Sequence, residues 1–232
     1  MRWWMGMAGL AAAMLAAPAL AQDEVVVTGT HRRAPDASTT SGVGIKRRAD
    51  FAVERVTVYG DARDKAQRRK EILDTVRGAI QLGAKRGIQL AFGEAVIQPL
   101  TLANVEDKLT FDEDDDRKDA EQVEFVIKTP LDSGDALAAI DRLAAFRKAV
   151  PLVGRAEIKA VGEPGVSIVS PSQYRGAILA AIAADANAAA RAFGPDYVVE
   201  VDGLNRAVRW VLTSPTEVLL YLDHELRVVP KR

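Results

Sequence analysis

The stretch Ser170–Gly194, SPSQYRGAILAAIAADANAAARAFG, predicts the helix around which the rest of the chain is organised. Ser170 is a favourable N-cap because its hydroxyl can accept hydrogen bonds from the free amides of the first turn. Pro171 fits the first helical position, and Gln173 completes a capping-box pattern with Ser170. Gly194, followed by a proline, ends the helical pattern.

One face of this predicted helix is apolar and consists mostly of alanine. The residues that recur at spacings of three and four are Ile178, Ala181, Ile182, Ala188, Ala189, Ala192 and Phe193. Strand-like runs lie on both sides of the helix in the sequence. We therefore expect the alanine face to be buried against a sheet, since small side chains allow a close approach.

The first 21 residues have the pattern of an export signal. A short positive start at Arg2 precedes an apolar run over Met5–Ala17, and Ala19–Ala21 fits an A-x-A cleavage site. We predict a cleavable signal peptide over residues 1–21 and a periplasmic mature protein. No later stretch is expected to span a bilayer, so the mature protein is predicted to have no transmembrane segment.

The overall composition excludes several classes of site and partner. The 232 residues include 31 basic and 32 acidic residues, a balance that gives no reason to expect nucleic acid or an anionic membrane as partner. The chain has no cysteine, which excludes disulfides, thiolate nucleophiles and cysteine metal ligands. Only two histidines, His31 and His224, are available for histidine-dependent chemistry.

The mature chain divides by composition into two regions. Residues 22–49 contain a strand-like run, Glu24–Thr30, and then an arginine- and glycine-containing segment over 31–49 that is predicted to be a flexible basic arm. Residues 50–232 contain the alternating strand and helix patterns. One alternative divides this region into two small subdomains, with an approximate boundary near residue 153.

The order of the predicted elements indicates an α+β fold with antiparallel or mixed sheets, three main helices packed on them and split β-α-β units. The other two helices are expected over 62–86, capped by Asp61, and over 134–149, capped by Asp132 or Ser133. Strands are expected over 51–59, within 88–102, and over 121–127, 197–201, 207–212 and 218–222. The stretch 156–169 is expected to form two strands around a turn at Gly162–Gly165.

Charge and apolar periodicity predict which faces of the two other helices are exposed. In 62–86 the solvated face is expected to carry Arg63, Lys65, Arg68, Arg69, Lys70 and Glu71. In 134–149 the core face is expected to carry Leu137, Ile140, Leu143, Ala144 and the following Val150.

The sharpest charged feature is the acidic loop at residues 112–119. Asp112, Asp114 and Asp116 have the first three spacings of an EF-hand calcium loop, but Arg117 occupies the position that needs glycine and Val123 the position that needs glutamate. The favoured interpretation is a solvated hairpin loop. The alternative is a small-ligand or calcium-binding protein that uses this loop.

The sequence shows no catalytic set, so no catalytic, cofactor-binding or metal-binding residue is predicted and the protein is not expected to be an enzyme. A Ser-His-Asp site using His224 is formally available, but there is no G-x-S-x-G elbow and His31 falls in the expected arm. Trp210, Tyr174 and Tyr221 have two open interpretations, as aromatics packed in the fold or as interface anchors.

Several phrases of the mature chain resemble the SIMPL-domain family of exported bacterial proteins. They are the strand Val25–Gly29, the phrase Arg47–Val53, the turn Lys85–Ile88, the alternating Asp-Ala helix at Asp185–Ala192 and the terminal strands within Glu217–Val229. The insertion at 31–46 departs from the family, and Thr101–Asn104 stands where a Tyr-x-Tyr-like phrase is common. The resemblance implies a non-enzymatic α+β envelope protein, in some members oligomeric or linked to stress. We therefore expect self-association or another envelope protein as partner.

Overall fold

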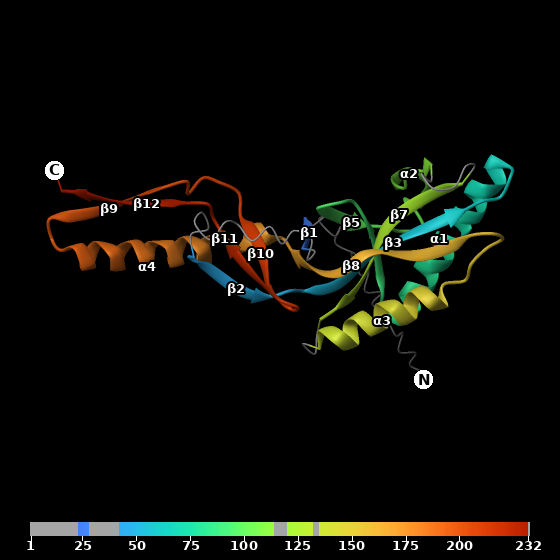
Figure 1. Cartoon of the computed structure of the whole chain (residues 1–232), viewed down its shortest axis with the longest axis horizontal. Coiled ribbons are helices and arrows are strands. Elements are labelled where there is room, and N and C mark those ends of the chain that lie inside the picture. The colour runs from blue at the N-terminus through green and yellow to red at the C-terminus, as the bar shows by residue number, and fades with distance from the viewer. Residues whose placement is uncertain (1–22, 28–41, 114–119, 132–134, 232) are drawn as a thin grey trace, which may run out of the picture.

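The computed structural model describes residues 23–27, 42–113, 120–131 and 135–231 (Figure 1). The expected signal peptide, residues 28–30 of the first expected strand, residues 31–41 of the expected basic arm and residues 114–119 of the acidic loop lie outside this range. In chain order the elements are β1 (Glu24–Val27), β2 (Gly44–Arg48), β3 (Phe51–Gly60), α1 (Lys65–Arg86), β4 (Gln89–Phe92), β5 (Val96–Pro99), α2 (Val105–Lys108), β6 (Asp112–Glu113), β7 (Glu121–Pro130), α3 (Ala136–Ala149), β8 (Glu157–Val169), the 3₁₀ helix η2 (Pro171–Tyr174), α4 (Arg175–Phe193), β9 (Tyr197–Asp202), β10 (Arg209–Ser214), β11 (Glu217–Tyr221) and β12 (Glu225–Pro230).

The α+β class is confirmed, and the strands of the described residues pair antiparallel. Six of them close into a barrel in the order β3-β8-β1-β5-β4-β7, because β3 also pairs with β7. β3, FAVERVTVYG, is rich in the β-branched and aromatic residues that favour strands. It pairs along its whole length with β7, from Phe51 opposite Pro130 to Gly60 opposite Glu121. Because β8 follows residue 153 and pairs with β1 and β3, residues from both sides of that approximate boundary build the barrel.

The main hydrophobic core lies outside the barrel wall. Side chains of β3 alternate between the two faces of the sheet, so Val56 and Val58 point outward while Val53 belongs to a small cluster inside the barrel. α1 and α3 cover the outer face (Figure 1). Their fully buried side chains include Ile72 from α1 and Phe146 from α3.

The other end of the molecule is an elongated arm, defined here as α4, β9 and β12 (Figure 1). β9 and β12 form a two-stranded sheet, and α4 packs on it. A three-stranded sheet of order β10-β11-β2 lies between the arm and the barrel (Figure 1). The three main helices are therefore α1, α3 and α4, as the sequence predicts.

The predicted helix caps were wrong by a few residues. The carboxylate of Asp64, not Asp61, caps α1 by accepting from the Gln67 backbone N–H at 2.8 Å. Asp135 caps α3 in the same way, in place of the expected Asp132 or Ser133, which lie outside the described residues. In both stretches several neighbouring polar residues could cap a helix. Which of them does so depends on the residue at which the backbone becomes helical, and the sequence pattern does not specify that residue. The glycine at the end of α1, Gly87, has the expected left-handed conformation with φ 68°.

Ser170 does not cap α4. Its own backbone is in the left-handed region, with φ 46° and ψ 61°, and it makes no side-chain capping hydrogen bond. The Gln173 side chain donates to the Val169 carbonyl, so the capping box is absent as well. The reason is tertiary, because the Ser170 backbone N–H donates to the carbonyl of Asp23 and ties this turn to the start of β1.

The expected burial of the alanine face of α4 was wrong in its second half. Ile178, Ile182 and Ala186 are the buried residues of the helix, while Ala188, Ala192 and Phe193 are exposed. α4 packs on β9, β12 and β2, and these strands cover only one narrow stripe of the helix. Ala188→Glu, which a buried face would not tolerate, is therefore not expected to disrupt the fold.

The solvated face expected for α1 also needs correction, because Arg68 and Glu71 are buried. Arg68 donates to Glu121 at 2.9 Å and to the Ala62 carbonyl. The backbone N–H of Arg155 donates to the Glu71 carboxylate at 3.0 Å and, together with the Gln67 side chain, lowers the pKa of Glu71. These charges are buried because they fasten α1 to neighbouring segments.

Three other predictions were wrong for reasons of strand pairing and packing. Residues 44–48, which were expected to belong to the flexible basic segment 31–49, form β2, because an edge of β11 is available for pairing. The turn expected at Gly162–Gly165 is a bulge within the single strand β8, since both halves of β8 pair with β3. Leu137 is 74% exposed, whereas Leu143 and Val150 are buried as predicted and Ala139 and Phe146 complete the buried face.

One helical segment of the described residues has the length and apolar composition to cross a membrane. It is Pro171–Phe193, with a mean hydropathy of 1.2. Core helices of water-soluble proteins meet the same criterion, so the finding rests on length and composition only.

The pair formed by Glu121 and Arg68 predicts how stability responds to mutation. Both side chains are buried, and Arg69 also donates to Glu121, at 2.7 Å. Glu121→Ala leaves Arg68 buried without its partner, and we expect the free energy of unfolding to fall by about 3–5 kcal/mol, measured by urea denaturation. Glu113→Ala, on the exposed strand β6, is the control and should stay close to the parent.

The same carboxylate predicts the direction of a pH effect. Burial raises the pKa of Glu121, but the hydrogen bonds from Arg69 and Arg68 outweigh it and leave the pKa lowered. The stability that Glu121 contributes is therefore present above its unfolded-state pKa and is lost as the pH falls through its lowered folded-state pKa. Urea denaturation at decreasing pH should show a smaller acid-induced loss in Glu121→Ala than in the parent. Equal losses would contradict this role.

Candidate functional site

The barrel interior is the first candidate site. Its small inner cluster consists of Val26, Val53, Ala91, Ile97 and Val126, with Phe51 packed against it. These residues come from β1, β3, β4, β5 and β7. Alternation along each strand sends one set of side chains inward, so five separate sequence segments meet in the lumen.

A buried charged network lies on one side of this cluster. Lys128 on β7 forms an ion pair with Glu24 on β1, and the Ser167 hydroxyl on β8 donates to the same carboxylate. Glu24 and Lys128 are about 6% and 5% exposed, and Ser167 is fully buried. The Lys128 ammonium also lies 4.3 Å from the centre of the Phe51 ring. The network links three strands of the barrel and satisfies the buried charges within the wall.

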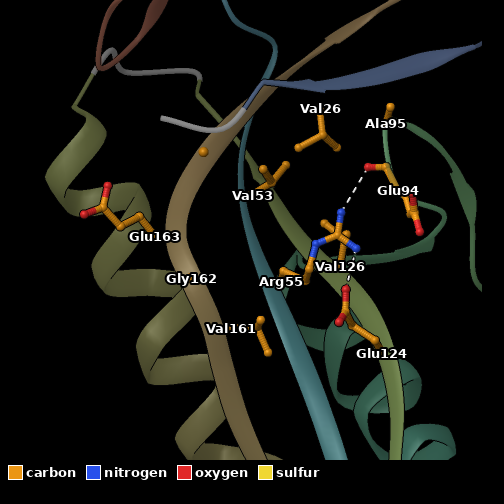
Figure 2. A pocket seen from close by; sticks show the side chains of 11 residues that line it. Val26, Val53, Arg55, Glu94, Ala95, Glu124, Val126, Val161, Gly162 and Glu163 are labelled. Carbon is orange, nitrogen blue, oxygen red and sulfur yellow. Dashed lines mark hydrogen bonds and ion pairs between the residues drawn. The ribbon is translucent and has the colours of Figure 1, made fainter. Parts of the chain in front are cut away.

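An open pocket of about 490 Å³ lies on the other side, at the mouth of the barrel. Figure 2 shows Arg55 of β3 at its centre. Its guanidinium donates to the Glu124 carboxylate at 2.5 Å and to the Glu94 backbone carbonyl at 3.0 Å. Four valines supply the apolar walls, namely Val26, Val53, Val126 and Val161. The site therefore combines an apolar wall with one held cation, and it presents no nucleophile with a base beside it.

Most of the acidic loop lies outside the described residues. Asp112 is exposed in the short strand β6, and Asp114, Asp116 and Arg117 lie outside the described residues. Among the residues that the structure describes, no group of three or more histidine, aspartate or glutamate side chains is placed to hold a metal ion. The calcium alternative thus gains no support from the part of the loop that can be seen.

The histidine and aromatic candidates occupy structural positions where they are described. His224 is buried, with its Nδ1 atom 2.8 Å from the Leu222 carbonyl oxygen, and His31 lies outside the described residues. Trp210 packs against the core, while Tyr221 is buried and burial raises its pKa. The Tyr174 ring lies under the Arg47 guanidinium at 4.5 Å. These contacts favour the packed interpretation over the interface one.

Sequence reasoning missed the charged residues of the barrel, Glu24, Arg55, Glu124 and Lys128. Glu24, Arg55 and Glu124 lie within runs that the sequence predicts as strands, and Lys128 directly follows one; all four are in the same alternating phase as the valines of the inner cluster. The signal available was a charge inside a β-branched run, as Arg55 is in FAVERVTVY. A charge at such a position is also expected on a strand with one solvent-exposed face. The sequence therefore indicates an inward-facing charge only once it is known that the strands close into a barrel.

The arm is the second candidate surface. Its exposed large side chains lie around the end of α4 and on the two strands, and they are Phe193, Tyr197, Val198 and Val228. The rings of Phe193 and Tyr197 are 6.4 Å apart, centre to centre. An exposed apolar surface of this kind is typical of an interaction site.

Comparison of the chain with family models, with curated proteins and with solved structures finds no match. The resemblance to SIMPL-domain proteins therefore stays a prediction, and the function has to be argued from the two surfaces above.

The buried network predicts a strongly non-additive response to mutation. Glu24→Ala leaves the Lys128 ammonium buried without its partner, and we expect a loss of about 3–5 kcal/mol in the free energy of unfolding. Replacing both charges, as in Glu24→Leu with Lys128→Met, should cost less than Glu24→Ala alone, because no unpaired charge remains. Chemical denaturation of the two variants measures the difference. A double variant less stable than the single one would contradict this account, and Glu94→Gln at the exposed mouth is the neutral control.

Proposed function

We propose that this chain is a periplasmic, non-enzymatic interaction or assembly protein of the cell envelope, and that it works by self-association through the arm. The export pattern over residues 1–21 supports the location. The resemblance to SIMPL-domain proteins supports an envelope role related to stress. The observation that carries the proposal is the incomplete cover of α4, an apolar helix of which Ile178, Ile182 and Ala186 are the buried residues.

The exposed side of α4 is suited to contact with protein. Its residues are mostly alanines, including Ala177, Ala180, Ala184 and Ala188, which let another backbone approach closely. At its end the exposed Phe193 adds a large apolar side chain. Burial of aromatic side chains contributes much of the energy of protein interfaces.

A membrane surface fits this face less well. Interfacial helices bind through large apolar residues such as Trp, Phe and Leu, with Lys and Arg on their polar face. The exposed side of α4 has alanines instead, and both Asp185 and Arg191 are exposed on it. The far face of the two-stranded sheet is charged, and Arg227 there lies beside Glu225 at 3.2 Å.

A second copy of the chain is the partner that the charges favour. A two-fold contact places the same surface against itself, so a surface with a strong excess of one sign would repel its copy. Asp185 and Arg191 give α4 one exposed charge of each sign. The arm also extends away from the barrel, so a second copy can reach it (Figure 1).

The oligomeric state tests this proposal. We expect light scattering of the mature chain at micromolar concentrations to give a mass above that of the monomer. Ala188→Glu should shift the mass toward the monomer while the far-ultraviolet circular dichroism is kept, because Ala188 is exposed. Ala84→Glu, the same substitution at an exposed alanine of α1, is the matched control and should assemble like the parent.

Two results would overturn the proposal. One is a parent protein that stays monomeric over the whole range and forms no cross-link to itself. The other is a monomer that floats with phospholipid vesicles and loses this binding in Ala188→Glu, since the arm would then be a membrane-binding element.

A further inference from the structure

The pocket at the mouth of the barrel plays no part in self-association through the arm, yet it is built like a ligand site. Its volume of about 490 Å³ lies within the range of small-molecule sites in proteins. Val53 and Val126 in its wall are about 2% and 1% exposed, so they cannot move without disturbing the barrel. β3, which carries Val53 and Arg55, is hydrogen-bonded on both edges. The pocket is therefore preformed and rigid.

Arg55 is the cation that this pocket presents to a ligand. Lys128, the basic residue of the inner network, is buried in its pair with Glu24 and also lies over Phe51, and Arg55 is the basic residue among those that line the pocket. A guanidinium has five N–H donors. Arg55 uses two in the hydrogen bonds to Glu124 and to the Glu94 carbonyl, which hold the group in place and leave three donors. The side chain is 25% exposed, so a ligand can reach it.

The other acidic residues at the rim do not occupy the pocket. Figure 2 shows the side chain of Glu163 directed toward the far side of β8, away from Arg55. The carboxylate of Glu94 also points away, and its backbone carbonyl is the group that faces the arginine. Glu163 and Glu94 are exposed, so water screens their charges. Glu124 is the one carboxylate in contact with the guanidinium, and it is 41% exposed.

We propose that this pocket binds a small amphiphilic carboxylate, with its hydrocarbon body against the valine walls and its carboxylate at the Arg55 guanidinium. Arginine is the side chain best matched to a carboxylate, because its planar donors can bind both oxygens. The lining is mostly apolar, with Val161 partly exposed above the buried Val26, Val53 and Val126, so a hydrocarbon body can lie against it without further hydrogen-bond partners. Glu124 competes with the ligand for Arg55 and so lowers its affinity.

Isothermal titration calorimetry of the mature chain with decanoate tests this site, with decanol as the uncharged probe of the same chain length. We expect saturable 1:1 binding of decanoate and much weaker binding of decanol. Arg55→Gln should weaken decanoate binding roughly tenfold or more, as expected for loss of a charge-assisted contact. Glu124→Gln should strengthen it, because it removes the competing negative charge, while the amide oxygen and the Glu94 carbonyl can still accept from Arg55 and hold it in place.

Two further variants separate binding from folding. Val161→Trp fills the pocket from a partly exposed position, so it should abolish binding while the protein stays folded. Arg142→Gln, at an exposed arginine of α3 outside the pocket, should bind decanoate like the parent. No saturable heat with decanoate, or binding that Arg55→Gln and Val161→Trp both leave unchanged, would overturn the proposal. Neither result depends on self-association, which light scattering measures separately.

Discussion

Pairing of β3 on both of its edges is the constraint on which the rest of the structure depends. The strand is hydrogen-bonded to β7 along one edge and to β8 along the other, and this closes the ring of six strands. Closure leaves no free edge in the ring and separates the two faces of each strand. The outward face takes α1 and α3 and forms the main core, while the inward face forms the small lumen. Both the fold and the pocket therefore follow from one strand.

Much of the local structure could be predicted from the sequence, because it depends on neighbouring residues. β3 is rich in β-branched and aromatic residues, and α1 ends at Gly87 in the left-handed conformation that glycine favours. The barrel could not be predicted in the same way. Its closure requires Arg55 to lie opposite both Val126 and Val161, and nothing near Arg55 in the sequence specifies these partners. Strand pairing joins segments that are distant in the sequence. The alternation of apolar and polar residues along one strand does not specify which segment it pairs with.

The wrong predictions about burial share one physical cause. Periodicity shows which residues of a helix share a face, but it does not show how wide the covering layer is. The stripe on α4 is continuous in the sequence, yet the strands packed on the helix, β9, β12 and β2, leave only Ile178, Ile182 and Ala186 buried. In α1 the prediction was wrong in the other direction, because a residue expected to be exposed is buried. Arg68 is charged, but it is buried because it pairs with Glu121 on β7 at 2.9 Å. Partners supplied by other elements decide both cases.

The buried pair between Glu24 and Lys128 explains how so short a strand as β1 keeps its register. β1 has four residues and must pair with both β5 and β8, and a slip by one residue would exchange its two faces. Three of its residues are valines, so apolar contacts alone distinguish poorly between registers. Glu24 breaks this degeneracy, because only one register places its carboxylate at both the Lys128 ammonium and the Ser167 hydroxyl. In any slipped register Lys128 would stay buried without a counter-charge, which costs several kcal/mol. The charges inside the barrel thus add specificity where the valines cannot, and they hold Val26 in the wall of the pocket.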